Sequence, residues 1–262
     1  MNNSLLKALD ILSLFSPTEP RMSLSTISHK MNIPKSTVHN MLATLVFRGF
    51  IERVDNDQYS LGTAVIVLAQ AARVNVELRD RAAPLLSEVA EACHESIYLT
   101  THEGDNLLYI YAIESPRRLL ARTAIGDRVP MHCTANGKAI LACLPENEVT
   151  TFIEHTKLPV FTPNTISDAD SLRQELLLTK SRGYGLDNEE HESGTYCIGA
   201  PIFDSNVRVV GACSISGEDP DILGNRLPEL VGLIKKTAQE ISRRMGYVPS
   251  APSQVFTLSL PN

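Results

Sequence analysis

The stretch from Ser23 to Arg53, SLSTISHKMNIPKSTVHNMLATLVFRGFIER, decides the fold of the N-terminal part of the chain. Its apolar residues recur with helical spacing, first over 24–31 and then over 38–46, which predicts a short helix followed by a longer one. Between them, Asn32 tolerates left-handed backbone angles and Pro34 suits the first turn of a helix. Two helices joined by so tight a turn form a helix-turn-helix.

The exposed face of the second predicted helix carries short polar side chains and one cation, with no acidic residue among them. Lysine and hydroxyl groups contact phosphates, whereas histidine, asparagine and threonine contact base edges. This pattern predicts a helix whose N-terminal end enters the DNA major groove. The alternative is a solvated polar face on an ordinary amphipathic helix. The predicted DNA-binding residues are Lys35, Ser36, Thr37, His39, Asn40 and Thr44.

Two β-prone runs follow this helix pair, at 50–54 and 58–61. Asp55, Asn56 and Asp57 separate them, and these residue types are typical of a hairpin turn. A leading helix over 5–15, the helix-turn-helix and the hairpin together predict a winged helix-turn-helix domain.

Several short segments occur in a specific order along the chain: Lys7–Leu12, Pro34–His39, Tyr59–Gly62, Met131–His132, Gly137–Ala139, Arg182–Asp187, Glu189–Glu190 and Ser214–Gly217. On these segments the chain resembles the IclR family of bacterial transcriptional regulators, from about Leu5 to Gly246. The resemblance implies a GAF-like fold for the C-terminal part, with a pocket for a small organic ligand.

The rest of the chain interleaves strand pairs with helices, without the regular alternation of a parallel sheet. It therefore predicts an α+β domain with a mostly antiparallel sheet. Strands are expected at 96–101, 107–113 and 118–123. We expect a winged helix-turn-helix domain at 1–62, a linker helix at 63–78, an effector-binding domain at 79–248 and a loosely ordered tail at 249–262.

Composition favours a cytoplasmic protein. Of 262 residues, 43% are hydrophobic, which is enough for globular cores, but no run reaches the roughly 18 apolar residues of a membrane helix. The first residues, MNNS, do not resemble a signal peptide. The five cysteines form no CxxC pair and are odd in number, which indicates reduced thiols.

The net charge of −6 is unusual for a DNA-binding protein and is unevenly distributed. Residues 1–61 hold six basic and five acidic side chains, a net charge of +1, which leaves −7 for the remainder. Because phosphate contacts dominate affinity for DNA, one such head should bind weakly. A homodimer or homotetramer that presents paired heads to a palindromic operator is the expected solution.

Three polar stretches of the C-terminal part are candidates for the ligand pocket. The resemblance to the family implies that the bound molecule contacts the backbone amides of Ala135 and Asn136 and the side chains of four residues further along the chain. Many family members have Gly-Ala where this chain has Ala135-Asn136, which adds a side chain at the pocket edge. The alternative is that the serines and the aspartate satisfy buried backbone groups. The four side chains are those of Asp187, Cys197, Ser214 and Ser216.

Other chemistry has weaker support in the sequence. The spacing of His132, Cys133, Cys197 and Cys213 fits no zinc pattern, so no metal is expected. Gly137-Lys138 lacks the rest of a phosphate-binding loop, and no cofactor is expected. An enzyme with Cys197 as nucleophile and His191 as base remains the alternative function.

The sequence thus predicts a ligand-responsive, DNA-binding transcriptional regulator rather than an enzyme. The family resemblance further implies a repressor of a catabolic operon, controlled by a small organic acid such as a keto acid, sugar acid or aromatic acid. An anion is favoured because helix N-termini offer free backbone N–H groups.

Overall fold

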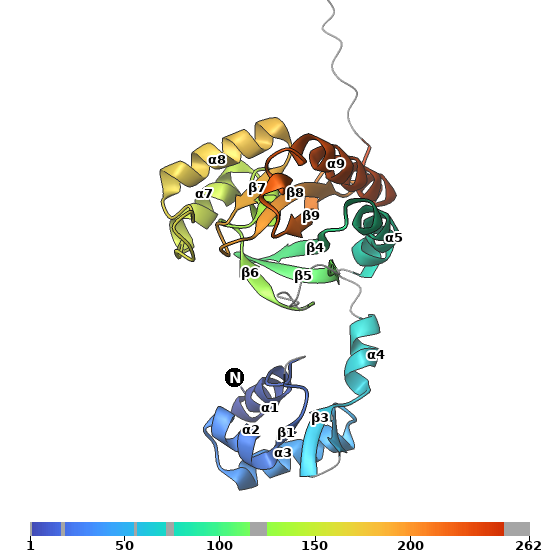
Figure 1. Ribbon diagram of the computed structural model, residues 1–262. Helices are drawn as coiled ribbons and strands as arrows, with labels where there is room; N and C mark the ends of the chain where they lie inside the picture. Colours follow the sequence, from blue (N-terminus) through green and yellow to red (C-terminus); the bar gives the residue numbers. More distant parts are fainter. Residues whose placement is uncertain (1, 17–18, 55–56, 72–75, 116–124, 249–262) are drawn as a thin grey trace, which may run out of the picture. The chain divides into compact units, whose positions relative to one another are not determined.

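The computed structural model describes residues 2–16, 19–54, 57–71, 76–115 and 125–248. The chain divides into two compact units, Met1–Val76 and Glu77–Asn262 (Figure 1). The predicted tail at 249–262 and the predicted strand at 118–123 lie outside the described residues.

The N-terminal unit contains the predicted helix-turn-helix. Helix α1 spans Asn3–Ser13, α2 spans Leu24–Met31 and α3 spans Lys35–Phe47. One buried side chain from each, Ile11, Ile27 and Leu42, meets the others in a single core. The apolar spacing identified the packed faces of α2 and α3, where Ile27, Val38 and Leu42 are buried. For α1 the predicted stripe of Leu5, Ala8, Leu9, Leu12 and Phe15 was wrong in part, because Leu5 and Leu9 are more than half exposed and Ile11, outside that stripe, is buried.

The turn between α2 and α3 is fixed by its backbone. Asn32 ends α2 in the left-handed conformation, with φ 51°. The Ser28 hydroxyl donates to the carbonyl of Ile33 at 2.7 Å. Pro34 is the N-cap of α3, one position before the expected first helical turn, and no side chain caps this helix.

A small antiparallel sheet completes the winged domain. Strands β1 (Met22–Ser23), β2 (Ile51–Val54) and β3 (Gln58–Leu61) pair in the order β1-β3-β2, so the wing is the β2–β3 hairpin. Helix α4, Ala64–Ala71, follows the hairpin. Residues 72–75 of the expected linker helix lie outside the described residues. The next helix begins at Val76, the last residue of the first unit, and continues into the second unit.

The C-terminal unit is built on one antiparallel sheet, which confirms the α+β prediction. Its strand order is β6-β5-β4-β9-β8-β7. The neighbours β4 and β9 are more than a hundred residues apart in the chain. The strands are β4 (Ser96–Glu103), β5 (Asn106–Ile113), β6 (Arg128–Pro130), β7 (Gly185–Asn188), β8 (Tyr196–Phe203) and β9 (Val209–Gly217).

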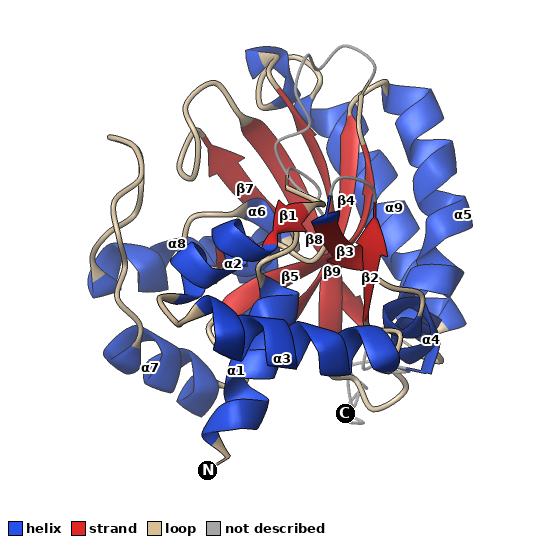
Figure 2. Cartoon of the chain, turned by 90° about the horizontal axis from the view of Figure 1, so that it is seen from below, coloured by secondary structure: helices blue, strands red, loops and turns tan. Residues whose placement is uncertain are grey.

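Helices cover both faces of this sheet (Figures 1 and 2). On one face, α5 (Val76–Cys93) and α9 (Leu227–Arg244) form a core with the strand residues. On the other face lie α6 (Ala135–Leu141), α7 (Glu146–His155) and α8 (Ala169–Arg182). Because successive strand residues point to opposite faces, the apolar residues that meet α5 and α9 alternate with residues that face α6.

Helix α6 is buried over its whole length and lies directly on the sheet. Glycines at the contact make this approach possible. A Cβ at Gly199 would lie 2.7 Å from backbone atoms of Ala135 and Asn136, and one at Gly185 would overlap the Ala135 carbonyl. The start of α6 is therefore held against β7 and β8 by contact between backbones.

This contact predicts that Gly199→Ala destabilises the C-terminal unit by about 1–3 kcal/mol, because the added methyl overpacks the helix–sheet contact. Urea unfolding of the full chain measures the effect. The control is Gly232→Ala in α9, where a Cβ meets nothing within 4 Å. That substitution should be neutral or stabilise by about 0.5–1 kcal/mol. Equal stabilities of the two variants would contradict the tight contact.

Candidate functional site

Strand register brings the predicted pocket residues together on the sheet face that carries α6. Ser216 pairs with Cys197, and Cys197 pairs with Asp187, so these three side chains form one row across β9, β8 and β7. Ser214 pairs with Tyr98 on β4 and with Gly199 on β8, which adds a second row. Gly199 has no side chain, and the start of α6 occupies the space above it.

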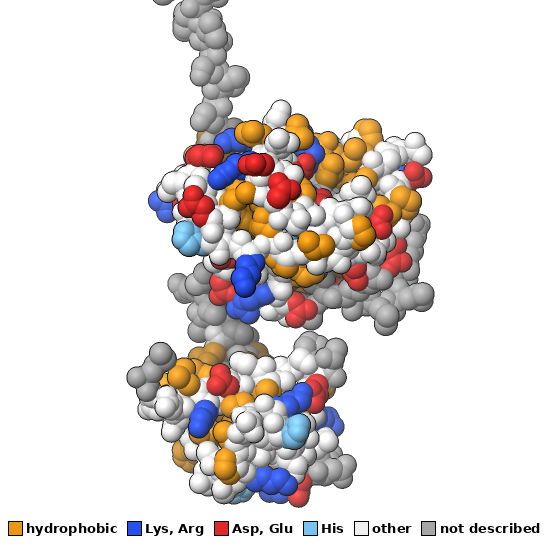
Figure 3. All heavy atoms as spheres, turned by 90° about the vertical axis from the view of Figure 1, so that its left-hand side faces the viewer, with side chains coloured by type: hydrophobic (Ala, Val, Ile, Leu, Met, Phe, Trp, Pro, Cys, Tyr) orange, Lys and Arg blue, Asp and Glu red, His pale blue; other side chains and the backbone are white. Residues whose placement is uncertain are grey.

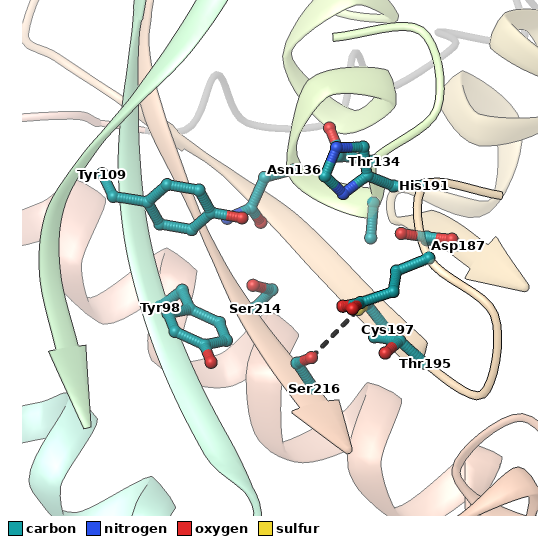
Figure 4. A pocket seen from close by; sticks show the side chains of 12 residues that line it. Tyr98, Tyr109, Thr134, Asn136, Asp187, His191, Thr195, Cys197, Ser214 and Ser216 are labelled. Atoms are coloured by element: carbon teal, nitrogen blue, oxygen red, sulfur yellow. Dashed lines mark hydrogen bonds between the residues drawn. The ribbon is translucent and has the colours of Figure 1, made fainter. Parts of the chain in front are cut away.

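All six residues predicted for the ligand line a single pocket, with an empty volume of about 470 Å³ that includes its open mouth. Ala135 and Asn136 enter from α6, and the other four come from β7, β8 and β9. Figure 4 shows Ser214 and Ser216 on the strand between a pair of tyrosines and the side chains of Asp187 and Thr195. The Cys197 thiol donates to the Ser216 hydroxyl at 3.1 Å.

Six further residues line the same pocket and were not among the six predicted ligand contacts, although Thr134 and His191 lie within the candidate polar stretches. The rings of Tyr98 and Tyr109 pack edge to face, 5.3 Å apart. Thr134 directly precedes Ala135, and Thr195 lies two residues before Cys197, so both could have been included from their position alone. The tyrosines required knowledge of the strand pairing. The complete additional set is Tyr98, Tyr109, Thr134, His191, Glu192 and Thr195.

The first turn of α6 presents polar groups to this pocket. Thr134 is the N-cap, and its hydroxyl accepts from the Gly137 N–H at 3.3 Å. Among the described residues, no hydrogen bond uses the N–H groups of Ala135 or Asn136. The Asn136 Oδ1 is buried without a hydrogen-bond partner among the described residues. Such orphaned polar atoms are uncommon in folded proteins and indicate a place for a ligand.

In the N-terminal unit, the predicted DNA-binding residues lie on α3, and five of the six are exposed, whereas Thr37 is half-buried. Thr37, Asn40 and Thr44 line a groove beside α1, so they face a different side of α3 from Lys35. The Thr44 hydroxyl donates to the Asn40 carbonyl at 3.1 Å, which leaves its oxygen as an acceptor and its methyl for apolar contact.

Basic and acidic side chains are interspersed on the face of the N-terminal unit that Figure 3 displays. Lys30 and Arg53 are engaged in ion pairs with Glu19 and Asp57. No ion pair among the described residues uses Lys35. Its charge at the start of α3 is therefore available for a phosphate, where the helix dipole also favours an anion.

The sequence matches two family descriptions in succession: "IclR helix-turn-helix domain" over residues 4–55 and "Bacterial transcriptional regulator IclR C-terminal" over residues 70–243. The chain belongs to the IclR family of bacterial transcriptional regulators. Its N-terminal unit is accordingly a DNA-binding helix-turn-helix domain.

Similar proteins of this family align over almost the whole chain. The HTH-type transcriptional regulator KipR of Bacillus subtilis (strain 168) is 32% identical over 246 residues, which cover 94% of this chain and 98% of that protein. XynR of Escherichia coli (strain K12), an HTH-type transcriptional regulator, is 31% identical over 92% of this chain and 96% of its own length. Both of these similar proteins are named as transcriptional regulators.

Solved structures of the family share the fold. Thermotoga maritima IclR matches with a TM-score of 0.81 and 32% identity, covering 94% of this chain and all of its own. An IclR homolog from Microbacterium hydrocarbonoxydans, complexed with 4-hydroxybenzoate, matches with a TM-score of 0.84. Its identity is 22%, over 93% of this chain and 99% of that one.

Asp187 is the pocket group whose protonation is most altered by its surroundings. Its side chain is only 3% exposed. Burial, together with the nearby Glu190 carboxylate, raises the pKa of Asp187 to about 7. The Glu190 N–H, which donates to Asp187 Oδ1 at 2.8 Å, opposes this rise. The pocket of this IclR-family protein thus contains a carboxyl group that is partly protonated at neutral pH.

A buried cation lies behind the pocket wall. Lys138 of α6 is 1% exposed and pairs with Glu190, and its ammonium lies 3.9 Å from Glu175. Glu175 in turn pairs with Arg182 at 2.5 Å. Lys138 does not line the pocket. Breaking such a buried pair is strongly destabilising, because the remaining charge is left without a partner.

His191 lines the pocket from the turn between β7 and β8. Its ring lies 5.0 Å from that of Phe161, which lies 6.2 Å from His132. Burial lowers the pKa of both histidines, so both rings are favoured as neutral imidazoles. The neutral His191 ring can donate to or accept from a ligand.

The two residues of the alternative enzyme, Cys197 and His191, both line the pocket, and the Cys197 thiol donates to the Ser216 hydroxyl. The described residues contain no cluster of three or more metal-ligating His, Cys, Asp or Glu side chains. All five cysteines are free thiols. Burial raises the pKa of Cys143 to about 11 and of Cys213 to about 12, so both are almost entirely in the thiol form at neutral pH.

Within the described part of the chain, no helix is long and apolar enough to cross a membrane.

The shifted pKa predicts how Asp187→Asn changes stability with pH. The native carboxyl holds its proton up to about pH 7, whereas the unfolded one releases it near pH 4. Wild-type stability therefore falls as the pH rises through this window. The asparagine side chain does not titrate. The free energy of unfolding of the variant, relative to that of the wild type, should therefore be about 2 kcal/mol higher at pH 7.5 than at pH 5.

Calorimetric unfolding at the two pH values tests this expectation. The matched control is Asp105→Asn in the exposed turn between β4 and β5, which should shift stability equally at both. A pH-independent effect of Asp187→Asn would show that the native carboxyl titrates in its ordinary range.

Proposed function

We propose that this protein is a ligand-responsive transcriptional repressor of a catabolic operon, controlled by a small organic acid bound in the C-terminal unit. The observation that carries the proposal is the convergence of six residues from α6, β7, β8 and β9 on one pocket. Buried groups without partners at the start of α6 support a ligand there. Two similar proteins bear the names "Transcriptional repressor IclR" and "Acetate operon repressor".

The ligand would lie with its carboxylate on the free N–H groups of Ala135 and Asn136. Hydroxyl or carbonyl groups would meet Cys197, Ser214 and Ser216. Asp187 would repel a carboxylate placed beside it and therefore faces the hydroxyl end of the ligand. The proposal thus assigns opposite ends of the ligand to α6 and to β7.

Oligomerisation is part of the proposal. Leu5 and Leu9 on α1 are more than half exposed, as are Ile66 and Val67 on α4. Exposed apolar surface on so small a domain is typical of protein contacts. A homodimer, or a homotetramer made of two, would cover these side chains and present paired α3 helices to a palindromic operator.

Lys35→Ala should weaken binding to every DNA sequence and flatten the salt dependence by about one released ion per chain, because it removes a phosphate contact. Asn40→Ala should instead lose about 1–3 kcal/mol of discrimination at particular base pairs. Fluorescence anisotropy with promoter fragments and random duplexes, at several salt concentrations, separates these effects. Lys236→Ala, on the exposed surface of α9, is the control and should change neither.

Equal affinity of the wild-type protein for promoter and random DNA at physiological salt would refute specific recognition. A loss of discrimination in Lys35→Ala without a general loss of affinity would refute the separate roles of the two residues.

Ligand control requires that the ligand favour one arrangement of the DNA-binding heads over another. A coupling of about 1–3 kcal/mol would change DNA affinity roughly 5- to 150-fold. Titration calorimetry with small acids, including pyruvate and 4-hydroxybenzoate, followed by DNA titration with any that bind, measures this coupling. The combined variant Ser214→Ala/Ser216→Ala should lose the response and keep ligand-free DNA binding.

A ligand that binds tightly and leaves DNA affinity unchanged would overturn the switch. A double variant that still responds would overturn the assignment of the pocket, because its hydroxyl groups would then be dispensable.

A further inference from the structure

We propose that the C-terminal unit contains a second binding pocket, beyond the C-terminal end of α6, and that this pocket binds a small phosphate monoester such as a sugar phosphate. The proposal goes beyond the proposed function, because it assigns a different site and a different class of ligand. Cationic side chains, the start of a helix and a buried imidazole converge there.

The second pocket is a large hollow at one end of the sheet. Its empty volume is about 1190 Å³, which includes its open mouth. Its walls come from the end of β4, the connection between α6 and α7, the helices α7 and α8, and the turn that leads into β9. None of the described residues that line it also lines the ligand pocket, the one beside Ala135 and Ser214.

The two pockets lie toward opposite ends of shared elements. Along β4, Tyr98 lines the ligand pocket and His102 lines the second one. Their even spacing places both on the same face of the strand, about 13 Å apart. Helix α6 begins at Ala135, beside the ligand pocket, and ends at Leu141, two residues before Cys143 in the wall of the second pocket. Both pockets can therefore be occupied at the same time.

Two cations from different elements provide the attraction for an anion. Lys180 lies in the last turn of α8, and Arg208 follows the turn between β8 and β9. No ion pair between described residues uses either of them. Glu148 of α7 is the one carboxylate among the described lining residues. Asp204 accepts the Arg208 backbone N–H at 3.0 Å but does not line the pocket.

The start of α7 adds backbone donors to these cations. The helix follows Pro145, which lines the pocket, and no side chain caps it. Its first N–H groups, at Glu146 and Asn147, take part in no hydrogen bond among the described residues. Free N–H groups and the helix dipole favour an anion. Because Glu146 and Glu148 already complement the dipole, the helix start supports the site only in combination with Lys180 and Arg208.

The buried imidazole of His102 is a further polar group of this wall. Its Nδ1 is buried and has no hydrogen-bond partner among the described residues. Such orphaned atoms are uncommon in folded proteins. Because a neutral imidazole has one donor and one acceptor nitrogen, His102 can meet either a phosphate oxygen or a hydroxyl group.

The number of donors favours a phosphate over a carboxylate. A phosphate monoester has three terminal oxygens and a charge of about −1.5 to −2 at neutral pH, whereas a carboxylate has two oxygens and a single charge. Lys180, Arg208 and the start of α7 belong to separate elements, and each can bind one oxygen. Glu148 repels a second anionic group but can accept from a hydroxyl. These features suit a sugar phosphate better than a dicarboxylate.

Titration calorimetry of the full-length protein, in a buffer without phosphate, tests the ligand class. The phosphate monoesters are D-glucose 6-phosphate, D-ribose 5-phosphate and glycerol 3-phosphate. D-Glucose lacks the anionic group, and D-glucuronate carries a carboxylate at C6 in its place. At least one monoester should bind about tenfold or more tightly than both, because charge-assisted hydrogen bonds to phosphate are the strong ones. If no monoester binds, or if D-glucuronate binds as tightly as the best one, the proposal is wrong.

Paired substitutions of cations locate the binding. Lys180→Gln/Arg208→Gln should weaken the best monoester about 100-fold, because two charge-assisted hydrogen bonds are lost. The matched control is Lys236→Gln/Arg243→Gln, which removes the same charge from exposed side chains of α9, on the opposite face of the sheet. It should leave the affinity unchanged. Equal losses in the two variants would show a general attraction by net charge and would overturn the site.

Ser214→Ala/Ser216→Ala separates the second pocket from the ligand pocket. This variant should keep its affinity for the best monoester, because neither serine lines the second pocket. A loss as large as that of Lys180→Gln/Arg208→Gln would place the monoester in the ligand pocket and refute the second site. The ligand-responsive regulator is tested by small acids and DNA affinity, so its outcome is independent of this one.

Discussion

The direct contact between the start of α6 and the sheet is the constraint on which the C-terminal unit depends. Gly185 and Gly199 lie side by side in the strand register, through the pairing of β7 with β8, and leave the space that the backbone of Ala135 and Asn136 fills. Any larger side chain at either position would push α6 away. The pocket exists because the helix is pinned at this point, with its first turn beside the polar rows of β7, β8 and β9.

The burial of α6 has a consequence for charge. Its fourth residue, Lys138, cannot reach water and must find its partner inside the protein. Glu190 provides that partner from the turn after β7, so the ion pair fixes the turn that also carries His191 and follows Asp187. The hydroxyl of Thr165 donates to the Glu190 carbonyl at 2.6 Å and holds the same turn from outside.

The ion pair therefore serves the pocket indirectly. Isolated from solvent, the pair contributes little net stability, because desolvation offsets most of the attraction. Its effect is positional, because it holds the Glu190 carboxylate near Asp187. Burial and this second carboxylate raise the pKa of Asp187 to about 7, while the Lys138 charge opposes the rise. The same charge arrangement holds the Lys138 ammonium away from the pocket.

Much of this architecture is readable in the sequence, for identifiable reasons. The helices of the winged domain have regular apolar spacing, and the cap at Asp168 and the stop at Gly183 mark α8 directly. Strand β7 was not predicted, because four residues that include Gly185 and Asp187 show no apolar alternation. Pairings such as β4 with β9 join distant segments, so Tyr98 could not be placed in the pocket by periodicity.

The site residues divide in the same way. Asp187, Cys197, Ser214 and Ser216 were predicted through the family resemblance, which already contains the three-dimensional pairing. Lys138 was considered as the last residue of one candidate polar stretch and as part of a phosphate-binding loop. Its burial was not predicted, because lysine is almost never fully buried without a partner, and the partner lies 52 positions away.

The properties of helix α4 suggest how the proposed homodimer could link ligand binding to DNA binding. It has eight residues, and isolated helices shorter than about 12–15 residues are marginal in water. Its side chains do not compensate by burial, since Ile66 is 60% and Val67 64% exposed. Packing, rather than propensity, stabilises such a helix. In the proposed homodimer, contacts with a second copy would supply that packing, so the stability of α4 would depend on how the copies pair. A ligand in the C-terminal unit that favoured one pairing would then act on the DNA-binding heads through the stability of α4.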